Sequence, residues 1–152
     1  MTQQLAMPAN LPEAIAAPSE TVVVTLHAQG AQIYECKASD NGQLGWAARE
    51  PIAALLLDGE TVGRHYAGPN WEHVDGSAVV GKLSARAPAP SANNIPWLKL
   101  DVTEHRGKGV FSGVTTILRI NTQGGVVPRG ACGKPGALAS VAYATDYVFL
   151  RR

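Results

Sequence analysis

From residue 20 onward, hydrophobic and polar residues alternate with the two-residue repeat of β-strands, and no 12-residue stretch shows the apolar stripe of a helix. The stretch 20–27 is rich in β-branched residues, which favour extended backbone. The pattern predicts ten short strands, over residues 20–27, 32–37, 44–48, 53–57, 61–67, 70–73, 78–87, 97–105, 114–121 and 141–151. In the last strand, which is expected to be central, one face carries Tyr143, Thr145, Tyr147 and Phe149.

Turn signals rich in glycine separate many of these runs. Asp58-Gly59 is the clearest hairpin turn, and residues 28–30 are interpreted as a second hairpin connection. Further signals stand at Asp40-Asn41-Gly42, Asp75-Gly76 and Gly124-Gly125. Short strands at this spacing predict an all-β fold with long glycine- and proline-rich loops, either an antiparallel β-sandwich or a β-barrel.

The chain of 152 residues is long enough for one domain with a substantial core. Residues 1–19 carry three prolines and are expected to form an extended lead-in with a short helical turn over 12–16. Residues 20–152 are expected to form a single β domain. Within it, the proline-rich segment 85–96 is predicted to be a surface crossover, because proline cannot donate a hydrogen bond to a central strand.

Charge makes two classes of partner improbable. The chain has 13 Lys and Arg against 12 Asp and Glu, a net charge of +1, and no clustered basic stripe of the kind that binds nucleic acid or anionic membranes. The longest aliphatic run, residues 52–57, is much shorter than the about 18 residues of a membrane span. We therefore expect a soluble protein with no nucleic-acid partner and no membrane span; the sequence does not indicate an oligomeric state.

The two cysteines do not by themselves decide whether the protein folds in an oxidising or a reducing compartment. Cys36 and Cys132 can pair in only one way within a monomer, but they can equally be two buried thiols. Pairing would imply an oxidising compartment, and hence a secretory leader already removed. Residues 1–18 lack the basic and apolar regions of such a leader, so a cytoplasmic protein is the alternative.

The segment 62–76 is the most distinctive source of possible chemistry. Around its Gly68-Pro69 turn it gathers the candidate ligand-binding residues Arg64, His65, Tyr66, Trp71 and Glu72. A turn at that place folds the two arms together, which predicts one wall of a small pocket. His65 and Glu72 are the candidate acid–base pair. The alternative is a hairpin whose aromatic rings pack on the core and whose polar groups face water.

Other chemistry finds little support in the sequence. The four histidines lie on different predicted strands without a local His-x-His chelate, so no metal site is expected. There is no phosphate-binding loop, no G-x-G-x-x-G and no G-x-S-x-G nucleophile elbow, so no cofactor is expected.

Several long motifs occur in the order typical of one family. They are HAQGAQIYECKA (27–38), VGRHYAGPNWEHVDGSAVVGK (62–82), IPWLKL (95–100), GVFSGVTTILRINTQGGVVP (109–128) and YATDYVFL (143–150). In these the chain resembles the domain of unknown function numbered 3455, whose bacterial and fungal members usually follow a secretory leader. The resemblance implies that Cys36 and Cys132 form a disulfide and that the protein is secreted or periplasmic. It implies no catalytic residue.

Three functions are compatible with these patterns. The first is a secreted or periplasmic β domain that binds a small molecule or a glycan through the 62–76 segment, since aromatic rings beside Arg and Glu suit a ligand with flat and polar parts. The second is a hydrolase, isomerase or cyclase using His65 and Glu72. The third is a structural or adhesive envelope protein in which the segment only shapes a turn.

Overall fold

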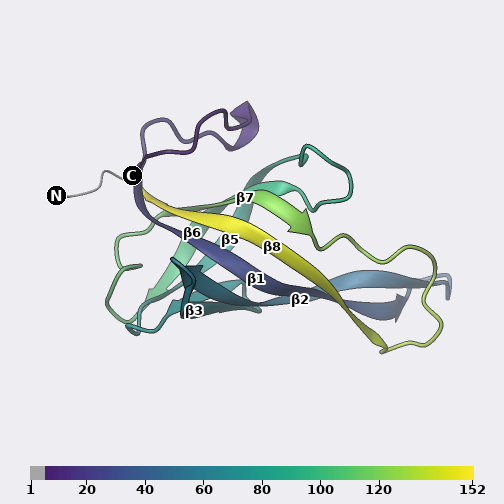
Figure 1. Cartoon of the computed structure of the whole chain (residues 1–152). Coiled ribbons are helices and arrows are strands. Elements are labelled where there is room, and N and C mark those ends of the chain that lie inside the picture. The colour runs from purple at the N-terminus through teal and green to yellow at the C-terminus, as the bar shows by residue number, and fades with distance from the viewer. Residues whose placement is uncertain (1–5) are drawn as a thin grey trace.

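The computed structural model describes residues 6–152, and in it eight antiparallel strands close into one barrel (Figure 1). Each strand pairs with the next along the chain, and the last pairs with the first. The strands are β1 (Thr21–Ala38), β2 (Leu44–Leu57), β3 (Glu60–Tyr66), β4 (Asn70–His73), β5 (Ala78–Ala87), β6 (Trp97–Arg106), β7 (Thr116–Gly124) and β8 (Leu138–Arg151). The all-β prediction is confirmed, and of the two predicted architectures the structure is the barrel.

The predicted hairpin at residues 28–30 is wrong, because these residues lie inside the single long strand β1. Gly30 pairs with Ala53 of β2 on one side and with Tyr143 of β8 on the other. A Cβ atom at Gly30 would lie 2.0 Å from the carbonyl oxygen of Ile52, so this glycine permits close approach of two strands rather than a turn. The predicted strands 44–48 and 53–57 are likewise one strand, β2.

Two apolar clusters hold the barrel together. The inner cluster fills the interior and includes one face of β8, where Tyr143, Tyr147 and Phe149 are at most 4% exposed. The outer cluster lies between β7, β8 and the N-terminal segment, whose short 3-10 helix η1 (Glu13–Ile15) falls within the predicted turn. Its buried members are Ile15, Ala17, Val22, Ala87, Leu118, Ile120, Val148 and Leu150. The first five residues of the predicted lead-in lie outside the described part of the chain.

One end of the barrel is sealed by the loop between β6 and β7. Phe111 in this loop is fully buried and stacks on Phe149, with ring centroids 4.5 Å apart. The loop is fixed by Asp75, whose carboxylate accepts hydrogen bonds from the amide of Val110 at 2.8 Å and from the hydroxyl of Ser77 at 2.6 Å. Phe111 therefore fills the interior of the barrel at this end.

The loop between β7 and β8 is tied to β1 by a disulfide between Cys36 and Cys132, with Cα atoms 5.7 Å apart. The pairing implied by the family resemblance is confirmed. Backbone bonds of 2.8 Å between Cys36 and both Gly136 and Ala137 hold the end of the same loop against β1. Disulfides are typical of proteins that fold in oxidising compartments. None of the helical segments in residues 6–152 has the length and apolar character needed to span a bilayer.

Candidate functional site: a pocket inside the barrel

The β3–β4 hairpin points alternate side chains into the barrel and toward the solvent. The strand register pairs His65 with Trp71 and, one step along, Arg64 with Glu72. Since neighbouring residues of a strand face opposite sides, the first pair points into the barrel and the second points out. Accordingly His65 and Trp71 are 3% and 1% exposed, whereas the side chains of Arg64 and Glu72 are 67% and 34% exposed. The predicted acid–base residues His65 and Glu72 thus lie on opposite faces of the sheet.

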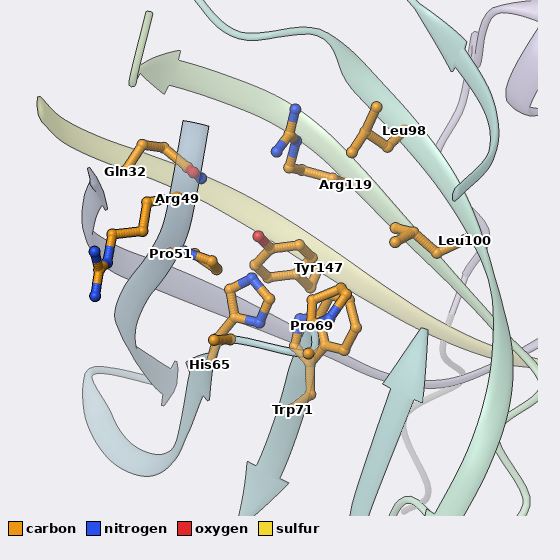
Figure 2. A pocket seen from close by; sticks show the side chains of 12 residues that line it. Gln32, Arg49, Pro51, His65, Pro69, Trp71, Leu98, Leu100, Arg119 and Tyr147 are labelled. Atoms are coloured by element: carbon orange, nitrogen blue, oxygen red, sulfur yellow. The ribbon is translucent and has the colours of Figure 1, made fainter. Parts of the chain in front are cut away.

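The inward pair forms an aromatic cluster with Tyr147 of β8 (Figure 2). The rings of His65 and Trp71 are stacked with centroids 4.4 Å apart, and Tyr147 lies 5.1 Å from His65 and 5.5 Å from Trp71. Gly81 of β5 leaves room for the indole, because a Cβ atom there would lie 2.9 Å from Trp71 Cζ3. The indole N–H of Trp71 is buried and has no hydrogen-bond acceptor among residues 6–152.

His65 is a neutral imidazole in this environment. Burial lowers its pKa from 6.5 to about 4, and the nearby positive charge of Arg119 acts in the same direction, against the effect of a hydrogen bond to the carbonyl of Asn70. Nδ1 lies 2.8 Å from that carbonyl oxygen, which can only accept, so Nδ1 carries the proton. Nε2 is therefore left as a hydrogen-bond acceptor at neutral pH.

Arg119 of β7 brings a positive charge to the inner side of the barrel. Its Nε and one terminal nitrogen donate to the carbonyl of Pro96 at 3.1 and 2.8 Å. No carboxylate forms an ion pair with it within residues 6–152. Burial lowers its pKa, an effect partly offset by the neighbouring Tyr147 and Tyr143, yet a guanidinium remains charged in proteins.

These groups line a pocket of about 360 Å³ (Figure 2). This volume lies within the range of roughly 300–1,000 Å³ found for small-molecule sites. The lining residues are Gln32, Arg49, Pro51, His65, Ala67, Gly68, Pro69, Trp71, Leu98, Leu100, Arg119 and Tyr147. Of the five predicted binding residues, only His65 and Trp71 are among them. Ala67, Gly68 and Pro69 of the same 62–76 segment also line the pocket. The remaining lining residues come from β1, β2, β6, β7 and β8, which the local motif could not indicate.

The remaining predicted residues form a polar network on the outer surface. Glu72 accepts hydrogen bonds from Arg64 at 3.2 Å and from the hydroxyl of Tyr66 at 2.7 Å. The bond with Tyr66 contributes most to lowering the pKa of Glu72 and to raising that of Tyr66. Arg106 of β6 donates to Tyr66 and to Asn70, at 3.2 and 2.8 Å. Every charge of this network is thus satisfied by another group of the protein.

The four histidines are not brought together. His27 pairs with Asp146 at 3.0 Å, His73 pairs with Asp75 at 3.3 Å, and His105 bonds to the carbonyl of Val114 at 2.7 Å. In the described part of the chain, no three His, Cys, Asp or Glu side chains are grouped as a metal site requires.

The fold and the pocket define a closed, eight-stranded, up-and-down β-barrel with a pocket of small-molecule size. The chain belongs to the family described as "Protein of unknown function (DUF3455)", which it matches over residues 16–59 and 56–151. No curated protein and no solved structure matches it.

Proposed function

We propose that this protein binds a small organic molecule inside its barrel, in the pocket between His65, Trp71, Tyr147 and Arg119. The observation that carries the proposal is the pocket itself, in which an apolar, aromatic wall stands next to a few fixed polar groups. Sites for small molecules have this composition, because apolar contact supplies affinity and the polar groups fix orientation. Phe111 fills the other end of the barrel and is not among the residues that line the pocket.

The geometry gives less support to an enzyme that uses His65 and Glu72 together. A general acid and base must both reach the substrate within hydrogen-bond distance, and these two side chains leave opposite faces of the hairpin. A pKa of about 4 also makes His65 a weak base at neutral pH. A glycan is a less suitable ligand than a compact molecule, since an extended sugar chain needs an open groove. A purely structural role does not account for a largely buried guanidinium that lines a pocket without a carboxylate partner.

We propose further that the protein works in an oxidising compartment, outside the cell or in the periplasm. The disulfide between Cys36 and Cys132 supports this location, because cytosolic thiols are kept reduced. Both cysteines are at most 7% exposed, so a transient redox role fits them less well than a structural one.

A neutral fluorescent probe, N-phenyl-1-naphthylamine, tests the binding proposal. Its emission rises when it enters an apolar site, and it should titrate the protein saturably with one site per chain. Leu98→Trp should weaken probe binding at least about tenfold, because Leu98 lines the pocket and a larger side chain fills it. The probe is excited directly, so that the added tryptophan does not contribute.

Leu83→Trp is the matched control, because Leu83 lies on the neighbouring strand β5 and is 42% exposed. This variant should bind the probe as the wild type does. Circular dichroism of both variants checks that the barrel is intact. Absence of saturable binding, or equal binding by the two folded variants, would rule out the proposed pocket.

A further inference from the structure

The charges that line the pocket are not balanced. Arg49 lines it as well, but its guanidinium is paired with both Glu35 and Glu50 at 2.8 Å. Arg119 has no such partner within residues 6–152. His65 is neutral, and burial raises the pKa of Tyr143 and of Tyr147, so neither phenol becomes an anion near neutral pH. The pocket therefore carries one uncompensated positive charge.

The hydrogen bonds of Arg119 show which part of the guanidinium is available. The carbonyl of Pro96 occupies one edge, formed by Nε and one terminal nitrogen. A guanidinium has five N–H donors, and the edge between its two terminal nitrogens is a second fork. Besides the Pro96 carbonyl, the hydrogen-bonding neighbour of the guanidinium among the described residues is the neutral hydroxyl of Tyr147, which brings no negative charge to the second edge. Such a fork matches the two oxygens of a carboxylate.

The rest of the lining indicates the shape of the molecule that carries the anion. Figure 2 shows Arg119 and Leu98 on one side of the pocket and the rings of His65, Trp71 and Tyr147 on the other. The stacked rings of His65 and Trp71 offer a flat apolar surface. The single cation suits a monoanion better than a phosphate dianion, which would leave negative charge without a partner in an apolar cavity.

We infer that the pocket selects a flat organic monocarboxylate, whose carboxylate pairs with the second edge of Arg119, beside the Tyr147 hydroxyl, and whose apolar body lies against the aromatic wall. The inference rests on the proposed function, because it names the class of ligand for the same pocket. Burying a charge is unfavourable unless it is paired. A ligand anion beside Arg119 would therefore offset the desolvation cost of its guanidinium.

Two ligands of the same shape test this inference. Displacement of N-phenyl-1-naphthylamine is measured with 2-naphthoate and with its neutral isostere 2-naphthamide. In the wild type, 2-naphthoate should bind at least about tenfold more tightly, because charged hydrogen bonds are stronger than neutral ones. This comparison needs no variant, so it remains decisive even if a substitution of Arg119 prevents folding.

The variants then assign the preference to one residue. Arg119→Gln should abolish the preference for the acid, and Arg119→Lys should retain part of it, since lysine keeps the charge but loses the fork. Arg64→Gln, on the outer face of the hairpin and outside the pocket lining, is the control and should leave the preference unchanged. Arg49→Gln tests the other cation of the lining.

Equal binding of acid and amide by the wild type, or a preference that survives in folded Arg119→Gln, would overturn the inference while leaving the binding proposal standing. If neither the neutral probe nor either naphthalene ligand binds, the proposed function fails and the inference fails with it. A preference that disappears in Arg49→Gln instead would move the anion site to the mouth of the pocket and overturn the assignment to Arg119.

Discussion

The inner and outer faces of the β3–β4 hairpin carry neighbouring residues of the same two strands but experience very different environments. On the inner face, His65 and Trp71 are almost completely buried and contact Tyr147. On the outer face, Arg64 and Glu72 form an ion pair that water can reach. The difference shows that two cross-strand pairs only one step apart can serve the core and the solvent separately. Alternation along the strands decides which pair is buried, and it is the buried pair that lines the pocket.

Trp71→Ala should have the largest effect, lowering the free energy of unfolding by about 4 kcal/mol. The indole is 1% exposed, so its removal leaves a large cavity and deprives His65 of its stacking partner. Urea denaturation followed by circular dichroism measures the change. Glu72→Ala is the outer-face counterpart and should cost less than about 1 kcal/mol. Similar losses for both variants would contradict the division between the two faces.

The stability of the protein should fall by about 2 kcal/mol between pH 7 and pH 5 because of His65. Its folded-state pKa of about 4 lies below the unfolded value of 6.5. The unfolded chain therefore binds a proton first as the pH falls, and the contribution is lost progressively from about pH 6.5 down to about pH 4.

Urea midpoints at the two pH values measure this loss, and His65→Phe is the comparison because it keeps an aromatic ring and removes the titrating group. The variant should lose most of the pH dependence in this window. Asp75 does not interfere: partial desolvation raises its pKa, but hydrogen bonds from Ser77 and Val110 hold it at about 2. An unchanged pH dependence in His65→Phe would show that another group is responsible.

Gly81→Ala should destabilise the inner face by about 1–2 kcal/mol. The added methyl would lie 2.9 Å from Trp71 Cζ3 and 3.4 Å from the Cβ atom of Leu100, so the indole must shift. Gly45→Ala is the control, because nothing lies within 4 Å of a Cβ atom there. Thermal unfolding of the two variants gives the comparison. A destabilisation of Gly45→Ala as large as that of Gly81→Ala would mean that strand propensity, not contact with Trp71, causes the effect.

The smallest effect is expected for Tyr66→Phe on the outer face, less than about 1 kcal/mol in stability and no change in binding of the naphthylamine probe. This substitution removes the hydrogen bond to Glu72 but no pocket contact. Probe titration and urea denaturation measure both quantities. Weaker probe binding by this variant would show that the outer network supports the pocket.

Much of the fold could be predicted because alternation and turn chemistry are local. The Asp58-Gly59 turn is one example: both residues adopt positive φ angles, 51° and 83°, which this pair tolerates better than most. The prediction of a hairpin at residues 28–30 failed for a non-local reason. Gly30 resembles a turn glycine in sequence, but its role is to let β1 and β2 approach each other.

The candidate site could be predicted only in part. Alternation along β3 already separates His65 from its neighbours Arg64 and Tyr66, but the strand register that pairs His65 with Trp71 is not visible in the sequence. Arg119 stands alone in an apolar run, between Leu118 and Ile120. Both of those neighbours are buried under the N-terminal segment. The strand therefore carries apolar residues on both faces, and its sequence does not indicate which face points into the pocket.

Because β1 pairs with β8, the strands form a continuous ring, and β1 and β8 have two neighbours each like every other strand. Thr21 lies opposite Arg151, so the two ends of the barrel segment are neighbours (Figure 1). A short linker between them, with a new opening at the exposed turn Asp58-Gly59, would give a circular permutant with the same ring of strands. In such a rearranged chain His65 and Trp71 would still precede Arg119 and Tyr147, whereas Gln32, Arg49 and Pro51 would follow them, so the same groups would form the pocket in a different order along the chain.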